Sequence, residues 1–265
     1  KGDDLNEIDK AVEAARNAEI AVLVLGENEW QRENKQGTDG EGYDVATLEL
    51  TGKQKELARK VMASGTPTVV VLINGRAMAI PWIDESIPAI VEAWIPGEKG
   101  GDAIADVLFG DYNPGGKLTV TFPRHAGQLP VYYNYKPSKL YWLENGWGNS
   151  YADIDYKPLY EFGHGLSYTT FEYAGLVISP ESSGPYGQFH VSAEIKNTGN
   201  RAGSEVVQLY LHDKISTVVR PVKELKGFTR IWLEPGESAT VSFTLTHEEL
   251  KMLDKHLDWV VEQGE

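Results

Sequence analysis

The spacing of hydrophobic residues in the first 122 residues switches between two patterns. Apolar residues recur at helical spacing over 5–18, 52–63 and 103–109, and Asp102 is expected to be the N-cap of the third helix. Short continuous apolar runs occupy 20–25, 68–73, 88–94 and 117–122 and predict fully buried strands. Alternating helices and doubly buried strands predict an α/β domain over 1–122, with a mainly parallel sheet and helices on both faces.

Beyond residue 170 the hydrophobic period changes to two. Apolar and polar residues alternate over 190–196, 206–212 and 240–245, and turns at 197–200 and 234–237 separate such runs. Short alternating strands of this kind predict an antiparallel β-sandwich over 171–265. Thr246 and Glu249 have the spacing of a capping box, which predicts one short helix at that point.

Neither period is present between residues 123 and 170. Gly, Pro, Tyr and Trp accumulate there instead. Aromatic side chains bury large areas, so we expect an ordered linker held down by aromatic packing, not a solvated tether.

Composition excludes several classes of function. The chain has 265 residues, of which 41% are hydrophobic, so it can form two ordinary cores. Its net charge of −14 argues against nucleic acid and anionic membrane surfaces as partners. It has no cysteine, which excludes disulfides and thiolate metal sites. No apolar run approaches the ~20 residues that span a bilayer.

A long polar loop, residues 26–50, follows the first predicted strand. Loops of this length in a compact domain are usually functional or disordered, and parallel sheets place their ligands where such loops leave the strands. Glu41 is flanked by Gly40 and Gly42, which allow its carboxyl group to enter a cleft. Glycoside hydrolysis needs two carboxyl groups, and Glu41 suits the acid/base role. Composition alone, however, favours a solvated surface loop, since charge runs usually face water.

Other chemistries lack a complete motif. The acidic residues do not have EF-hand spacing, and no His cluster suits zinc. The segment from His247 lacks the second His of metalloproteases, residues 97–101 lack the Lys-Ser/Thr pair of a phosphate loop, and Ser167 lacks a nucleophile elbow. We therefore expect no metal and no cofactor. Trp30, Trp142 and Trp147 suit either stacking on sugar rings or aromatic packing, and the last two suit packing at least as well.

Several long segments resemble glycoside hydrolase family 3. Residues 91–123 (VEAWIPGEKGGDAIADVLFGDYNPGGKLTVTFP), 158–169 (PLYEFGHGLSYT) and 206–211 (VVQLYL) resemble its C-terminal α/β-sandwich domain. Residues 222–228 (VKELKGF) resemble the fibronectin type III-like module that follows this domain in the β-glucosidase branch. The resemblance covers essentially the whole chain.

The resemblance implies a retaining exo-acting β-glucosidase that acts on terminal β-D-glucosyl residues of a β-glucoside or oligosaccharide. Residues 40–44 match the loop that carries the catalytic acid/base, which is thereby Glu41, and Trp30 and Tyr43 are candidates for the rim of the sugar site. Two positions depart from the family pattern: Val45 stands where many members have Arg, and Glu161 where many have Pro.

The resemblance also implies a missing partner domain. The family's nucleophile is an Asp on a preceding TIM barrel, which this chain does not contain, and both ends of the chain look incomplete. We therefore expect the C-terminal portion of an extracellular or periplasmic enzyme that hydrolyses almost nothing as an isolated chain. A β-xylosidase of the same family, a non-catalytic carbohydrate-binding module and a stand-alone enzyme of another type remain as alternatives.

Overall fold

A computed structural model describes residues 5–27, 38, 44–137 and 151–264. By its internal contacts the chain divides into two compact units. Unit 1 comprises Lys1–Leu108, Thr121–Val131 and Asp153–Tyr160, and unit 2 comprises Phe109–Val120, Tyr132–Ala152 and Glu161–Glu265.

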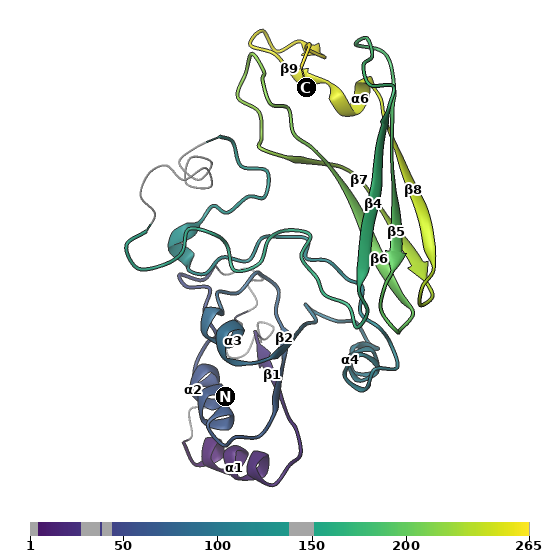
Figure 1. The fold of residues 1–265 in the computed structure, drawn as a ribbon. Helices are drawn as coiled ribbons and strands as arrows, with labels where there is room; N and C mark the ends of the chain where they lie inside the picture. Colours follow the sequence, from purple (N-terminus) through teal and green to yellow (C-terminus); the bar gives the residue numbers. More distant parts are fainter. Residues whose placement is uncertain (1–4, 28–37, 39–43, 138–150, 265) are drawn as a thin grey trace. The chain divides into compact units, whose positions relative to one another are not determined.

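Unit 1 contains a parallel sheet of three strands, β1 (Ala21–Gly26), β2 (Thr68–Ile73) and β3 (Ala89–Glu92) (Figure 1). The central strand is β2, and its register places Val70 opposite both Leu23 and Ile90. The middle of β2 is fully buried, because a central strand in such a sheet is covered on both faces. The predicted α/β fold with a parallel sheet is confirmed.

Two helices cover β1. The helices α1 (Leu5–Arg16) and α2 (Gln54–Met62) lie side by side (Figure 1). One core cluster joins them to the strand; its members are Ile8, Val12, Ala15, Ala21 and Val61, with Leu23 and Leu57 packed against it. The helical spacing of these apolar residues thus produces the face that buries the sheet.

The strand β1 is not fully buried, contrary to the expectation for residues 20–25. Its side chains alternate between faces, so Ala21 and Leu23 face α1 and α2 while Val22 and Val24 point the other way. Val22 is 46% exposed and Val24 60% exposed. The continuous apolar run was misleading because the described residues leave the face of β1 that carries Val22 and Val24 uncovered.

Two other predictions in this region need correction. The helix α4 (Gly100–Phe109) begins at Gly100, so Asp102 lies in its first turn and is not the N-cap. A carboxylate there still interacts favourably with the helix dipole. The helix α3 (Pro81–Ser86) was not predicted, since six residues are too few to show a helical period.

Residues 117–122 do not form the predicted strand. Phe122 makes only an isolated antiparallel bridge with Tyr160. Its side chain is fully buried and packs edge-on against Trp94 and Tyr160. The apolar character of this run therefore reflects single anchoring contacts and not a continuous ladder of hydrogen bonds. Tyr160 is also bound to α3, because its hydroxyl group donates a hydrogen bond to Asp84 Oδ1 at 2.5 Å.

Residues 126–128 form a short 3-10 helix, η1 (Ala126–Gln128). The buried carboxamide of Gln128 accepts from the backbone N–H of Arg124 and donates to the carbonyl of Asp155. These bonds join residues 124–128 to 155 within unit 1.

Unit 2 is an antiparallel β-sandwich. One sheet has the order β4 (Phe171–Ser179), β5 (Phe189–Asn197), β8 (Ser238–Leu245), and the other pairs β6 (Gly203–Leu211) with β7 (Glu224–Leu233). Ile195, Val207, Leu233 and Val241 from both sheets form the core, as the period of two predicted. The helix α6 (His247–Leu250) has the predicted capping box, and β9 (Met252–Leu253) pairs with β10 (Trp259–Val260).

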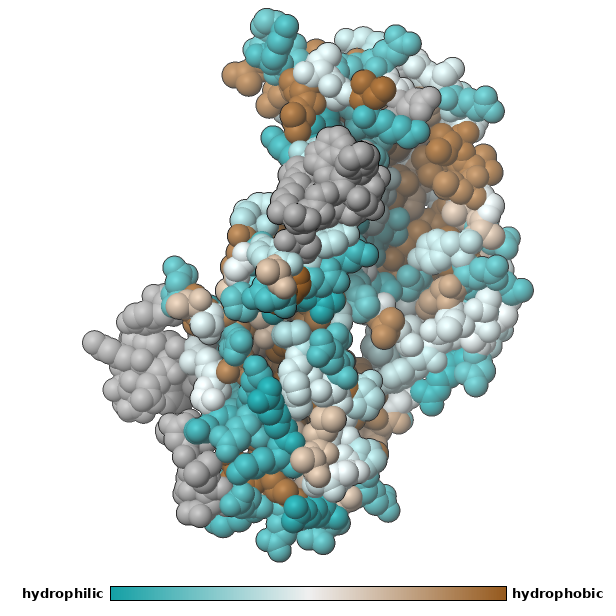
Figure 2. Space-filling view, turned by 60° about the vertical axis from the view of Figure 1, so that its left-hand side comes forward, coloured by the Kyte–Doolittle hydropathy of each residue, from teal (hydrophilic) through white to brown (hydrophobic). Residues whose placement is uncertain are grey.

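The surface also carries hydrophobic side chains. Leu176, Val177 and Ile178 of β4 are more than half exposed. Figure 2 shows one face of the molecule, on which hydrophobic areas interrupt a largely hydrophilic surface. Among the helices in the described ranges, none has the length and apolar character of a membrane span.

Candidate functional site

Polar side chains gather where the three parallel strands of unit 1 end. Glu27 directly follows β1, Asn74 and Arg76 follow β2, and Glu92 is the last residue of β3. This is the carboxyl edge of the sheet, where open α/β sheets bind their ligands. The predicted site residues Glu41, Trp30 and Tyr43 belong to the loop that leaves this edge, and they lie outside the described residues, as do Trp142 and Trp147.

The backbone at Gly26 sets the start of this loop. Gly26 has a φ of +133°, and a Cβ there would lie 2.0 Å from the Ile73 carbonyl oxygen, so only glycine fits. The side chain of Gln54, at the start of α2, pairs with Gly26 like a neighbouring strand. Its Oε1 accepts from Gly26 N at 2.7 Å, and its Nε2 donates to Gly26 O at 2.8 Å. The last residue of β1 is therefore held on both sides.

The segment that follows β2 contacts the loop at three points. The Gly75 N–H donates to Glu27 Oε2 at 3.3 Å, Arg76 Nη2 donates to Thr38 O at 3.1 Å, and the Ala79 N–H donates to Leu48 O at 2.8 Å. The same segment is a firm support because Met78, Ala79 and Ile80 are buried. Thr38 and Leu48 lie on either side of Glu41 in the sequence, so one buried segment holds the chain on both sides of it.

Glu27 and Arg76 form a buried ion pair. Arg76 Nε lies 3.1 Å from Glu27 Oε1, and the side chains are 19% and 2% exposed, respectively. Removing one partner of such a pair leaves an uncompensated charge in a poorly hydrated place. Replacing either Glu27 or Arg76 alone should therefore destabilise the fold around the remaining charge.

Glu92 is a second carboxyl group of unusual character at this edge. Burial raises the pKa of Glu92 to about 7, although hydrogen bonds from the Trp94 N–H at 2.9 Å and Asn74 Nδ2 at 3.4 Å favour the charged form. Trp94 has a φ of +52°, a strained value for a bulky residue. Near neutral pH, Glu92 is thus divided between its charged and neutral forms.

Asn74 connects Glu92 to the segment after β2. Its side chain is fully buried, and its Nδ2 donates to Arg76 O at 2.9 Å as well as to Glu92. Its Oδ1 is buried without a hydrogen-bond partner in the described part of the chain. Asn74, Arg76 and Glu92 were not among the predicted site residues; the signal that identifies them is their position at the carboxyl ends of strands.

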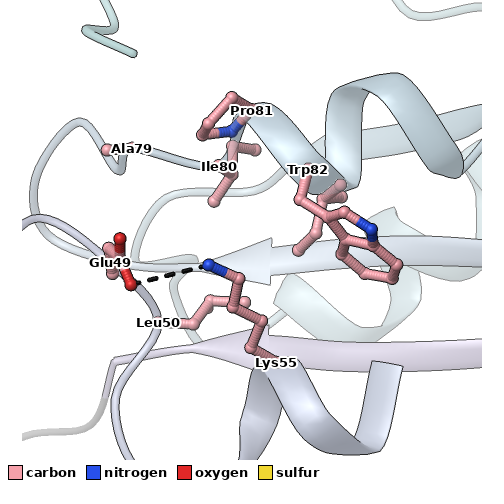
Figure 3. A pocket seen from close by; sticks show the side chains of 8 residues that line it. Glu49, Leu50, Lys55, Ala79, Ile80, Pro81 and Trp82 are labelled. Carbon is pink, nitrogen blue, oxygen red and sulfur yellow. Dashed lines mark ion pairs between the residues drawn. The ribbon is translucent and has the colours of Figure 1, made fainter. Parts of the chain in front are cut away.

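A small hollow lies beside this region, between the end of the loop and α3 (Figure 3). Its lining residues are Glu49, Leu50, Lys55, Ala79, Ile80, Pro81, Trp82 and Ile83. Glu49 and Lys55 form an ion pair of 3.7 Å at its mouth. Its cavity volume of about 20 Å³ has room for about one water molecule and is far below the range of about 300–1,000 Å³ typical of ligand pockets. We therefore do not assign a substrate to it.

None of the described residues forms a cluster of three His, Cys, Asp or Glu side chains suited to a metal ion. The carboxyl edge of the sheet carries two buried or partly buried carboxyl groups, those of Glu27 and Glu92.

Known proteins resemble this chain along its full length. It is 46% identical to a β-xylosidase of Formosa agariphila, with 100% of this chain and 36% of the relative covered. It is 42% identical to the periplasmic β-glucosidase of Salmonella typhimurium, with 97% and 33% covered. The crystal structure of a Listeria innocua β-glucosidase in complex with glucose superposes with a TM-score of 0.86 at 37% identity, covering 98% of this chain and 35% of that one. The chain thus spans about a third of the length of these relatives.

Two family profiles divide the sequence between them. The glycosyl hydrolase family 3 C-terminal domain matches residues 4–168, and a fibronectin type III-like domain matches residues 205–265. The parallel sheet of unit 1 and the antiparallel sandwich of unit 2 agree with these two matches in order and type. The chain therefore belongs to the glycosyl hydrolase family 3 C-terminal domain family and carries a fibronectin type III-like domain after it.

Proposed function

We propose that this chain is the C-terminal portion of a retaining, exo-acting β-glucosidase and supplies Glu41 as the general acid/base. The observation that carries this proposal is the placement of the loop. It leaves the carboxyl edge of the parallel sheet at Gly26 and is tied to the segment after β2 at Thr38 and Leu48. A catalytic side chain needs such support, because small displacements are costly in rate.

The reaction requires a second carboxylate from outside this chain. An Asp on a preceding TIM barrel, about 5–5.5 Å from Glu41, would attack the anomeric carbon while Glu41 gives its proton to the departing glycosidic oxygen. In the second step Glu41, now a carboxylate, takes a proton from water as the water oxygen attacks the glycosyl ester and releases the Asp. The charge on the Asp keeps Glu41 protonated before attack, and ester formation removes that charge. Trp30 and Tyr43 would line the rim of the sugar site.

Several finer parts of the proposal rest on the names of the relatives or on the sequence pattern. A location outside the cytoplasm accords with the name of the Salmonella relative, a periplasmic β-glucosidase. The domain boundaries at residues 122 and 170, and the inactivity of the isolated chain, belong to the proposal too. The substrate class is a terminal β-D-glucoside.

A β-xylosidase is the second candidate, because a relative of that name is 46% identical over the whole chain. The two candidates differ in the substituent at C5 of the sugar. Comparing kcat/KM for an aryl β-glucoside and the matching aryl β-xyloside on the whole enzyme decides between them.

The acid/base role is tested with Glu41→Ala in the whole polypeptide that carries the barrel. We expect kcat for an aryl β-glucoside to fall by about 10²–10⁴-fold, the usual contribution of general acid–base catalysis. Azide should restore turnover of an activated substrate and give a glycosyl azide, since azide attacks the ester without a base. The control is Glu33→Ala, which removes another loop carboxylate and should change little. A Glu41→Ala enzyme with the wild-type rate would exclude the role and leave a non-catalytic module.

A further inference from the structure

We propose that Arg76 is a positioning residue for the acid/base loop: it holds the chain at Thr38 and thereby limits where Glu41 can go. This inference rests on the proposed role of Glu41 and adds a residue from a different segment of the chain. Arg76 would not touch the substrate. It would act through the backbone of the loop.

The guanidinium group of Arg76 contacts two points of the loop, Thr38 and Glu27. Its Nη2 donates to the Thr38 carbonyl at 3.1 Å, while its Nε lies 3.1 Å from the buried Glu27 carboxylate, an ion-pair contact without hydrogen-bond geometry. Glu27 in turn accepts from the backbone N–H of Gly75, next to Arg76 itself. The guanidinium thus connects the start of the loop to a point 11 residues further along.

The backbone of Arg76 is itself held in place by buried neighbours and a hydrogen bond. Arg76 follows a strand whose residues are buried, and its own carbonyl accepts from the fully buried Asn74 side chain at 2.9 Å. The segment then continues into the buried residues 78–80. A long side chain gives precise placement only when its own backbone is fixed, and here it is.

The chain between Thr38 and Glu41 is short. Glu41 is three positions beyond Thr38 in the sequence, and three steps of extended chain span at most about 10–11 Å. Fixing Thr38 therefore sets an upper limit on the distance of Glu41 from this point. The second tie, from Ala79 to Leu48, lies seven residues beyond Glu41 and leaves more freedom. The tie at Arg76 is the tighter constraint of the two.

Arginine suits this task better than lysine does. Its planar group presents donors on several nitrogens, so one nitrogen can face Glu27 while another bonds to Thr38. Lysine would keep the positive charge beside Glu27 but concentrates its donors on a single atom. Arg76→Lys therefore preserves the ion pair and weakens the tie, whereas Arg76→Ala would also leave Glu27 unpaired and put folding at risk.

The test compares two aryl β-glucosides on the whole enzyme. A phenyl leaving group needs a proton from the acid, and a dinitrophenyl leaving group departs without one. Because kcat/KM reports the steps up to the glycosyl ester, it isolates acid catalysis. For Arg76→Lys we expect kcat/KM with the phenyl glucoside to fall by about 10–100-fold, as for a small misplacement of a catalytic group, and the dinitrophenyl value to change only a few-fold.

A matched control is Arg124→Lys. Arg124 also lies in unit 1, and its Nε donates to a backbone carbonyl, that of Lys157, at 3.2 Å. It makes the same kind of bond away from the loop, and both substrates should keep their wild-type values.

The outcomes separate this inference from the proposed function. An equal loss of kcat/KM on both substrates for Arg76→Lys would mean less folded enzyme. An unchanged kcat/KM on both would mean that the bond to Thr38 does not position the loop. Either result overturns the positioning role. Glu41→Ala is measured with the same two substrates. If Glu41→Ala discriminates between them and Arg76→Lys does not, only this inference fails. If Glu41→Ala does not discriminate, the acid/base assignment fails and removes the basis of this inference.

Discussion

Replacing Glu92 by Gln should change how the stability of unit 1 depends on pH. Burial raises the pKa of this carboxyl group from its ordinary value of 4.5 to about 7. The folded state therefore keeps a proton that the unfolded chain releases between these values. Gln is neutral at every pH and has nearly the shape of the protonated acid, so it removes this titration with little change in packing.

The sign of the effect follows from proton linkage. A group whose pKa is higher in the folded state stabilises the fold fully below its unfolded pKa, here 4.5, and the contribution is lost as pH rises through about 7. Each unit of pKa difference corresponds to about 1.4 kcal/mol, which sets an upper limit of about 3 kcal/mol for the loss. Residual solvent access to the carboxyl group will reduce this figure.

The assay is urea unfolding of wild type and Glu92→Gln from pH 4.5 to 8. Hydrogen exchange of peptides from β2 and β3 reports the transition of unit 1 separately from that of unit 2. We expect the variant to gain stability relative to wild type across this range, by up to about 3 kcal/mol at pH 8. Gln loses the long contact with Asn74 Nδ2, and this constant offset cancels in the pH dependence. Parallel pH profiles for the two proteins would refute the reasoning.

Two further predictions concern single packing positions. Gly26→Ala should destabilise unit 1 by about 3 kcal/mol or more in a denaturant titration, since its Cβ would overlap the Ile73 carbonyl. The control is Gly52→Ala, which is also at positive φ but in open space and should cost only about 1 kcal/mol. Equal costs would contradict the overlap. Asn197→Ala should cost unit 2 about 2–4 kcal/mol, because the buried amide donates to the carbonyls of Arg201 and Leu233 and accepts from the Thr169 hydroxyl. The exposed Asn200→Ala is its control, and a similar melting temperature for both variants would contradict the prediction.

The sequence alone determined the elements with a clear period and the identity of the family. The predicted segments 20–25 and 68–73 are strands β1 and β2, and the runs with a period of two are strands β5, β6 and β8 of the sandwich. These successes share a cause: side chains that alternate in or out of a core leave a pattern within a few neighbouring residues. The loop that we propose to carry the acid/base was likewise visible as a long polar interruption with glycines around Glu41.

Only the tertiary structure decided which polar residues meet at the edge of the sheet. Arg76 contacts Thr38 across 38 residues of sequence, and Asn74 reaches Glu92 across 18. Such contacts depend on the parallel register of three strands, which brings distant strand ends together and leaves no local pattern.

The same reason explains the errors in burial. A continuous apolar run cannot reveal that one face of β1 is left uncovered by the described residues, with Val24 exposed, because exposure depends on what packs on each face. Nor can it reveal that Phe122 is a single anchor and not part of a ladder, since a strand exists only through a partner strand. Local patterns set the elements of this chain, and long-range packing sets the environment of each polar side chain.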